Sequence, residues 1–477
     1  MNKKNVLDQK IINDFSNAHF CRDAILSFAN SALHYDTNDR YETRFYARKL
    51  RPHVLKYCNF DKPLEVGEIL NYSALSANRI LASMYEVDFL LLPDNAINHY
   101  SVNDFNEYYD GNRKAAACCA IPYLERYLFS FLEDEISISK GWTSSRVLEY
   151  FTYYAETSKA HEEDKFSKIM TLANNKERAG KDWLIQLASD FLLESSPMTR
   201  YAAGSYGNIG ANLFKIIIDE LGYGEYTRKH STIFERTLSS VDLNPTPHYY
   251  WQYYLNTSLL LSNYYNYITR DKRHFFRYIG AIFLAETDFI LSCMSWGKHL
   301  KQHIQGFDVE YFKEHNHIDK HHSAMVLNEL VRPAIERYGE FAAQNIIRGF
   351  EEAKWLSALL EKDFYEQTKW VNNADQYKSI HDEIFDKIKI AADNNEIIMQ
   401  RFIEPFSELS ITHCHDQDEL CHINSGTMEF INGFGKSTTL HAGEGTIIKR
   451  NRLHGALIES DTCNYSIYTI KDHEQWL

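Results

Sequence analysis

Apolar residues recur at helical spacing through most of the chain, from its start to about residue 370. The segment 183–193 is typical, because its apolar residues fall on one face of a helix. These residues are Leu184, Leu187, Ala188, Phe191 and Leu192. The alternation of apolar and polar residues that marks strands is scarce here. We therefore predict a long helical region, in which the polar, helix-like stretch 372–395 is the closest thing to a linker.

After Asn395 the pattern changes to short runs that are rich in β-branched and aromatic residues. Turns that contain glycine or asparagine separate these runs, as expected of strands. The runs cover residues 397–403, 426–431, 445–449 and 465–470. They predict one small β-barrel of about 80 residues. The predicted fold class is therefore multidomain α+β, with the helices first and the barrel last.

Length, charge and cysteine usage narrow the range of functions. At about 150 residues per domain, the 477 residues suggest about three domains. A net charge of −14 argues against a nucleic-acid partner. The eight cysteines form no C-x-x-C pair, which disfavours disulfides and a cysteine-based zinc site. The first residues lack the apolar core of a signal peptide, and no window approaches about 18 uninterrupted apolar residues, so we expect a cytoplasmic protein without membrane contact.

Three histidines of the β region have the spacing of a metal site. His413 and His415 are followed by Glu419 and Gly426 in the pattern H-x-H-x3-E-x6-G. Residues i and i+2 of a strand share one face, so both histidines are predicted to point into the barrel. His454, from a later strand, completes a set that leaves coordination positions open for substrate and oxygen. Glu419 is either a fourth ligand or a carboxylate that orients a histidine.

A second set of candidate ligands lies in the helical region. His315, Asp319 and His322 are spaced i, i+4 and i+7, which places them on one face of a helix. Carboxylates also occur inside apolar helical segments, where an unpaired one would cost several kcal/mol. These further candidates are Glu194, Glu220, the nearby His230, and Glu286.

Several alternatives to this second metal site stay open. The carboxylates could form salt bridges or lie at the surface, and Asp219 or Asp288 could be the buried acidic residues instead. His299 and His303 form a further i, i+4 pair that competes as a ligand pair.

Charge favours the metal interpretation. Glu194, Glu220, Glu286 and Asp319 carry four negative charges, which two ferrous ions would balance. Three histidines complete a mixed nitrogen and oxygen shell of the kind that iron accepts. Helical bundles hold dimetal sites in this way, with ligands that project inward from several helices. The Glu-x-x-His pair of ferritin-like sites is absent from these helices, so the order of ligands is a different one.

The order Glu, then Glu with His, then His-x3-Asp-x2-His resembles the heme-oxygenase-like diiron oxidases and oxygenases. The additional glutamate, matched by Glu286, resembles the branch of that family that oxidises nitrogen. Together with the C-terminal histidines, the resemblance covers nearly the whole chain. It implies a helical dimerisation region at residues 1–135, a heme-oxygenase-like diiron domain at 136–390 and a cupin domain at 391–477.

The C-terminal motif resembles the first cupin motif residue for residue. Gly443 and His454 match the second motif at the family's spacing. The chain departs from that motif with Lys449 where proline is usual and Asn451 where glycine is usual. Asparagine tolerates the turn geometry better than most residues, so the second departure is minor.

The resemblance also implies cofactors and an activity. Two Fe(II) ions would be held by Glu194, Glu220, His230, Glu286, His315, Asp319 and His322, and one Fe(II) by His413, His415 and His454. With O2 as co-substrate and an external reductant, the helical site would hydroxylate the guanidine of an amino acid of the Nω-methyl-L-arginine type. The cupin iron would then rearrange the hydroxylated guanidine into an N-nitrosourea. The protein would be a non-heme iron monooxygenase and a homodimer.

Two other functions stay open at this point. A diiron N-oxygenase could act on L-arginine or another amine and give a different product with an N–N bond. A metal-binding sensor, in which the cupin binds an effector, is the other alternative, although no helix-turn-helix is apparent in the sequence. Within the cupin itself, the alternative to an active iron site is one that is empty or purely structural.

Overall fold

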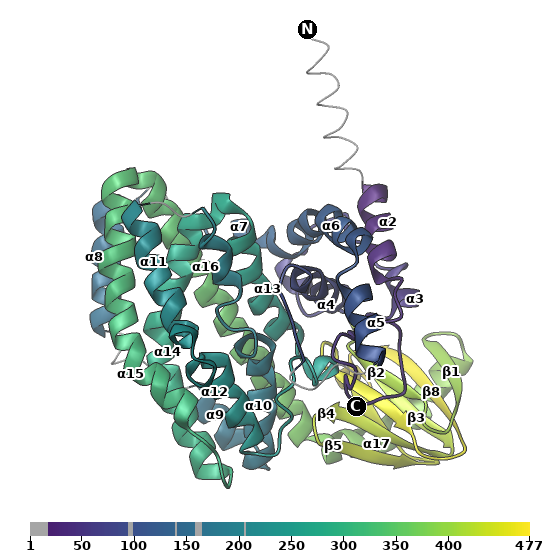
Figure 1. The fold of residues 1–477 in the computed structure, drawn as a ribbon. Helices are drawn as coiled ribbons and strands as arrows, with labels where there is room; N and C mark the ends of the chain where they lie inside the picture. Colours follow the sequence, from purple (N-terminus) through teal and green to yellow (C-terminus); the bar gives the residue numbers. More distant parts are fainter. Residues whose placement is uncertain (1–17, 94–98, 139–140, 158–164, 205–206) are drawn as a thin grey trace.

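The computed structural model describes residues 18–93, 99–138, 141–157, 165–204 and 207–477, without the side chains of 18, 99–101, 319, 320, 436 and 437. Within this part of the chain, α-helices extend to Asp393 and the first strand begins at Ile398. Figure 1 shows the helical bundle on the left, the N-terminal helices at the upper right and the β domain below them. The predicted multidomain α+β fold class is therefore confirmed.

The N-terminal helices pack around α4, whose residues are almost all buried. This helix lies against α6 and against α13 of the bundle, so the first part of the chain shares a core with the second. The helices of this part are α2 (Ala18–Ala29), α3 (Pro52–Leu55), α4 (Tyr72–Glu86), α5 (His99–Tyr108), α6 (Gly111–Phe129) and α7 (Phe131–Glu135).

The bundle is built around two long helices, α14 and α16, which pack against each other. Its helices are α8 (Ser144–Thr157), α9 (Lys165–Leu172), α10 (Lys176–Phe191), α11 (Gly207–Glu220), α12 (His230–Ser239), α13 (Asn256–Arg270), α14 (Phe275–His303), α15 (Glu310–Met325) and α16 (Arg332–Asn372). Short 3₁₀ turns are Val66–Glu68, Pro197–Tyr201, Gly222–Gly224, Tyr226–Arg228, Trp251–Tyr253, Lys272–His274 and His473–Gln475. A π-helical segment, Val326–Val331, follows α15 directly. Such segments are frequent at functional sites.

Two glycines allow α14 and α16 to cross in backbone contact. A Cβ atom at Gly280 would lie 1.8 Å from the carbonyl oxygen of Ile346, and one at Gly349 would lie 1.9 Å from that of Arg277. No side chain fits at either position. The crossing therefore fixes the height and rotation of α14 against α16.

The segment Lys272–His303, which contains α14, is long and apolar enough to cross a membrane, with a mean hydropathy of 1.3. However, 61% of its apolar window is buried inside the protein. Its apolar residues pack against α15 and α16, which is the arrangement of a buried core helix.

The β domain consists of two four-stranded antiparallel sheets, with strand orders β1-β8-β3-β6 and β2-β7-β4-β5. This two-sheet arrangement is consistent with a cupin, and the chain passes repeatedly from one sheet to the other. The strands are β1 (Ile398–Pro405), β2 (Leu409–His413), β3 (Asp418–Ser425), β4 (Thr427–Gly433), β5 (Lys436–His441), β6 (Gly445–Ile448), β7 (His454–Ile458) and β8 (Thr462–Lys471).

The polar stretch that resembles a linker forms the helix α17 (Ala374–Asp393) and covers one of these sheets (Figure 1). Ile384 and Ile388 of this helix are fully buried against Leu420 and Ile447. The helix is amphipathic, so its polar face dominates the sequence while its isoleucines fill the core of the β domain. It is a structural part of that domain and not a free connection.

Candidate metal centres

The predicted ligands of the helical region come from five separate segments. Glu220 is the last residue of α11 and His230 the first of α12. Glu194 follows the end of α10, Glu286 lies in the middle of α14, and α15 carries the histidines. Asp319 also belongs to α15, but its side chain lies outside the described residues.

Four of these residues form one compact group. Donor atoms of Glu194, Glu220, His230 and His315 all lie within 4.8 Å of one another. Nδ1 of His230 lies 2.8 Å from Oε2 of Glu220 and 3.0 Å from Nε2 of His315. Nε2 of His315 lies 3.4 Å from Oε1 of Glu194.

A second group shares one carboxylate with the first. Donor atoms of Glu220, Glu286 and His322 lie within 4.8 Å of one another. Nδ1 of His322 is 3.2 Å from Oε2 of Glu286 and 3.6 Å from Oε1 of Glu220. Glu220 thus directs one oxygen to each group, so it would contribute to holding metal in both.

Residues that the sequence did not assign hold these side chains in place. The hydroxyl of Tyr311 lies 2.9 Å from both carboxylate oxygens of Glu194. The backbone oxygen of Tyr311 accepts a hydrogen bond from Nδ1 of His315. Oδ2 of Asp219 lies 2.9 Å from Nε2 of His322, on the side of the ring away from Glu286. Such partners fix the orientation of ligand side chains.

Of the competing candidates, Asp288 and His299 make their contacts away from the helical centre. The carboxylate of Asp288 accepts a hydrogen bond of 2.7 Å from the hydroxyl of Tyr154 on α8. His299 packs edge-on against Phe166, near the end of α14. Asp219 contacts a candidate ligand without belonging to either group. Among the alternatives, therefore, only Asp219 comes close to the helical centre.

The helical centre holds charges of both signs in the absence of metal. Burial opposes a charge on His322, but the Glu286 carboxylate outweighs it and raises the pKa of His322 to about 10. The pKa of His230 is raised as well, because the effect of Glu220 exceeds that of burial. Burial disfavours the Glu220 carboxylate, yet the neighbouring histidines hold its pKa below the usual range. Protons on the histidines therefore compensate the carboxylates until a metal ion replaces them.

The cupin centre brings three histidines together at one end of the β domain. Donor atoms of His413, His415 and His454 lie within 4.8 Å of one another. His413 ends β2 and pairs with His454, the first residue of β7. His415 lies beyond the end of β2, so strand alternation alone does not place it. Nδ1 of His413 and of His454 each bond to a backbone oxygen, which leaves Nε2 free to face the centre.

The histidines of the cupin centre are neutral at pH 7. Burial lowers the pKa of His454 to about 3 and that of His415 to about 4. Burial and the neighbouring histidines hold the pKa of His413 far below its usual range. Neutral imidazoles are the form that binds a metal, so this centre is ready without loss of a proton.

Glu419 stands beside one of the three histidines. Its Oε2 atom lies 3.2 Å from Nε2 of His415, and it is not a member of the compact cluster. Burial raises the pKa of this carboxyl to about 7. The position fits a carboxylate that orients His415.

The two departures from the cupin motif have structural explanations. Nζ of Lys449 lies 2.8 Å from Oδ2 of the buried Asp418, which also accepts a hydrogen bond from His473. Asp418, Asp472 and His473 are close enough to hold a metal ion, but the Lys449 ammonium already fills the role of the cation. Asn451 has a φ of 61°, the left-handed conformation for which glycine is usual.

Both donor sets fit iron. Carboxylates and imidazoles in the helical centre are the ligand types of non-heme diiron sites, and three imidazoles suit a single ion with open positions. A family model described as iron-containing redox enzyme matches residues 181–358, the segment that holds every predicted ligand of the helical centre. The helical domain is thus a heme-oxygenase-like domain of the iron-containing redox enzymes, as the sequence predicted.

The whole chain has a more specific relative. It is 42% identical over 459 residues to nitrosourea synthase of Streptomyces achromogenes subsp. streptozoticus, with 96% of each chain covered. The chain therefore belongs to the nitrosourea synthase family. This confirms the resemblance that the order of the ligands indicates.

Proposed function

We propose that the protein converts a guanidine-bearing amino acid of the Nω-methyl-L-arginine type into an N-nitrosourea in two oxygen-dependent steps. One observation carries this proposal: a single chain of the nitrosourea synthase family holds two donor sets of different chemistry. The carboxylate-rich centre suits two irons, and the histidine centre suits one. Two separate steps, one at each centre, account for both.

N-hydroxylation is assigned to the helical centre. Iron bound there supplies the activation of O2, with electrons from an external reductant. Glu220 supports two ions because its two oxygens face different groups. Tyr311 and Asp219 hold Glu194 and His322 by hydrogen bonds, so the ligands keep their positions while the charge of the centre changes. In this proposal Asp319 is the seventh ligand.

Formation of the N–N bond is assigned to the cupin centre. His413, His415 and His454 would hold one iron, which would supply the activation of O2 and bind the hydroxylated guanidine. His413 and His454 are buried and hydrogen-bonded through Nδ1, so their rings keep a fixed direction. Glu419, beside His415, is in a position to hold or accept a proton there.

We further propose that the enzyme is a cytoplasmic homodimer that assembles through residues 1–135 and acts on small molecules only. The net charge of −14 supports the lack of a nucleic-acid partner.

Product analysis tests the proposal. The iron-loaded enzyme is incubated with O2 and a reductant, in parallel with Nω-methyl-L-arginine and with L-arginine, and the products are identified by mass spectrometry. We expect hydroxylated intermediates followed by an N-nitrosourea from the methylated substrate. The absence of any oxygenated product from either amino acid would refute the assignment. If only L-arginine gave an oxygenated product, L-arginine would take the place of Nω-methyl-L-arginine as the proposed substrate.

A further inference from the structure

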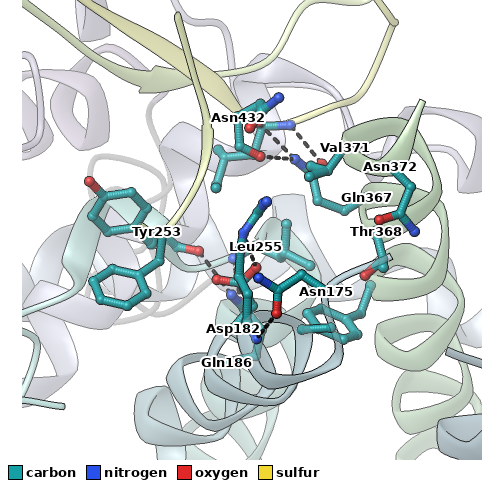
Figure 2. A pocket seen from close by; sticks show the side chains of 16 residues that line it. Asn175, Asp182, Gln186, Tyr253, Leu255, Gln367, Thr368, Val371, Asn372 and Asn432 are labelled. Atoms are coloured by element: carbon teal, nitrogen blue, oxygen red, sulfur yellow. Dashed lines mark hydrogen bonds and ion pairs between the residues drawn. The ribbon is translucent and has the colours of Figure 1, made fainter. Parts of the chain in front are cut away.

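A cavity lies at the junction of the helical bundle and the β domain, outside both sets of candidate metal ligands. Figure 2 shows Asp182 and Gln186 reaching it from below, Gln367 from the right and Asn432 from above. These residues belong to α10, α16 and β4, and none of the candidate metal ligands lines the cavity. We call it the junction cavity.

Three polar atoms in the wall of the junction cavity are buried and have no hydrogen-bond partner. They are Oδ1 of Asp182, Nε of Arg178 and Oδ1 of Asn432. The nearest approach of the two charged groups, from Nε of Arg178 to Oδ2 of Asp182, is 3.5 Å, too long for a good hydrogen bond. Asn432 is only 2% exposed. Native proteins rarely leave buried polar atoms unpaired, so three around one cavity indicate a missing ligand.

The other amides of the cavity wall are already used within the protein. Gln367 donates to the backbone oxygens of Asn432 and Leu453 and accepts from the amide of Leu453. Gln186 accepts from the amide of Leu255 and donates to the oxygen of Tyr253. These bonds make the wall rigid.

The chemistry of the unpaired atoms defines the ligand. Two are acceptors, on Asp182 and Asn432, and one is a donor, on Arg178. An ammonium group has donors for both acceptors, and a carboxylate accepts from the guanidinium. The volume of about 40 Å³ accommodates about three waters, at roughly 10–15 Å³ each, which is the scale of a small polar head group. Apolar contact is available from Leu255 and Phe364.

We propose that the junction cavity binds the zwitterionic end of a free α-amino acid, with its ammonium on Asp182 and Asn432 and its carboxylate on Arg178. Asn175, at the rim, is exposed, so a long side chain can leave the cavity toward solvent. Burial raises the pKa of Asp182 to about 7, and the ammonium of a ligand would favour its ionised form.

The position of the cavity suggests what it serves. Asp182 lies on α10, roughly 13 Å along the helix from its end at Phe191, and Glu194 follows that end. Leu453 in the cavity wall directly precedes His454. The cavity is therefore next to the cupin centre and is linked to the helical centre by α10. This role rests on the proposed function: the cavity holds the hydroxylated amino acid after N-hydroxylation at the helical centre and before formation of the N–N bond at the cupin centre.

Binding measurements test the site independently of turnover. Equilibrium dialysis of the iron-loaded protein without O2 gives the number of Nω-methyl-L-arginine molecules bound per chain. We expect Asp182→Asn and Arg178→Gln each to weaken one binding event at least tenfold. The matched control is Glu177→Gln, which removes an ion pair with Lys181 on the exposed face of the same helix. Unchanged binding in both cavity variants, or undiminished binding of the Nα-acetylated amino acid to this site, would overturn the proposal.

A turnover measurement separates this inference from the proposed function. During aerobic turnover we expect the cavity variants to release at least threefold more hydroxylated amino acid into solution, at an unchanged rate of hydroxylation. An equal free pool in variants and control would overturn the holding role. Should the wild-type enzyme form no hydroxylated amino acid, the proposed function fails, and dialysis alone still decides whether the cavity is a binding site.

Discussion

The helical centre and the cupin centre differ in the protonation state of the histidines that would bind iron. In the helical centre, carboxylates keep two histidines protonated, so a metal ion has to displace protons. In the cupin centre, burial keeps the histidines neutral, so no proton is displaced. The first centre depends on five segments that converge, whereas the cupin ligands lie in or directly beside two paired strands. We infer that the helical centre is the more labile of the two.

The largest effect should come from removing one ligand of either centre. His454→Ala should abolish tight iron binding in the cupin, so that hydroxylated guanidine accumulates and no N-nitrosourea forms. His315→Ala should stop hydroxylation, yet a supplied hydroxylated intermediate should still be converted. We expect losses of more than about 100-fold, because residues behind the ligands alone contribute 10–100-fold. Mass spectrometry of the products checks both. N-nitrosourea formed at the wild-type rate by the His454 variant would show that the cupin is only structural.

Acidity should affect the two centres differently. His322, with a pKa of about 10, and His230, whose pKa is also raised, bear protons at pH 7 that metal binding must release. The affinity of the helical centre for Fe(II) should therefore fall by about 100-fold for each unit of decrease in pH, for two protons released. The cupin histidines, with pKa values of about 3 and 4, take up no proton between about pH 6 and 8.

Anaerobic Fe(II) titrations at several pH values measure this difference. His454→Ala provides a protein with only the helical centre, and His315→Ala one in which the cupin is intact. Equal pH dependence of the two centres would contradict the contrast between them.

Two carboxylates of α14 should differ in importance although they are two residues apart. Glu286→Ala removes a carboxylate that faces His322, whereas Asp288→Ala removes a partner of Tyr154. We expect Glu286→Ala, which removes a candidate ligand, to weaken iron binding in the helical centre by at least about 100-fold, and Asp288→Ala to have little effect. Iron titration of both variants checks this. A greater effect of Asp288 would show that the rotation of α14 is assigned incorrectly.

A smaller effect is expected where the bundle supports the cupin. Gln367 of α16 forms two hydrogen bonds with the backbone of Leu453, next to His454. Gln367→Leu should weaken cupin iron binding by about tenfold, because His454 loses its fixed position. Lys369→Gln, on the exposed side of the same helix, is the control. The affinity of the helical centre for Fe(II) should be unchanged in both variants.

Much of the fold was predictable because its signals are local. The change of periodicity after Asn395 marks the start of the β domain, and H-x-H spacing marks two of the cupin histidines. The stretch 372–395 is a helix, as its pattern predicted. Its part in the β domain was not predictable, since the buried face of α17 is visible only once the sheet beneath it is known.

The helical site was predictable as a set of residues but not as a geometry. Helical phase separates Glu286 from Asp288 by about 200°, but only the packing of α14 shows which of them faces inward. The shared position of Glu220 depends on helices that are far apart in sequence. Tyr311 carried a usable signal, one helical turn before His315. No sequence signal indicated the junction cavity, because its walls come from segments that are far apart in the chain.

Iron stoichiometry tests the central claim most directly. After anaerobic loading and removal of free metal, we predict three Fe(II) per chain for the wild type, two for His454→Ala and one for Glu220→Ala, because Glu220 belongs to both groups of the helical centre. Mössbauer spectra should assign the remaining iron of the Glu220 variant to the cupin. Retention of three irons by the Glu220 variant, or the same iron content in the wild type and the His454 variant, would contradict the account.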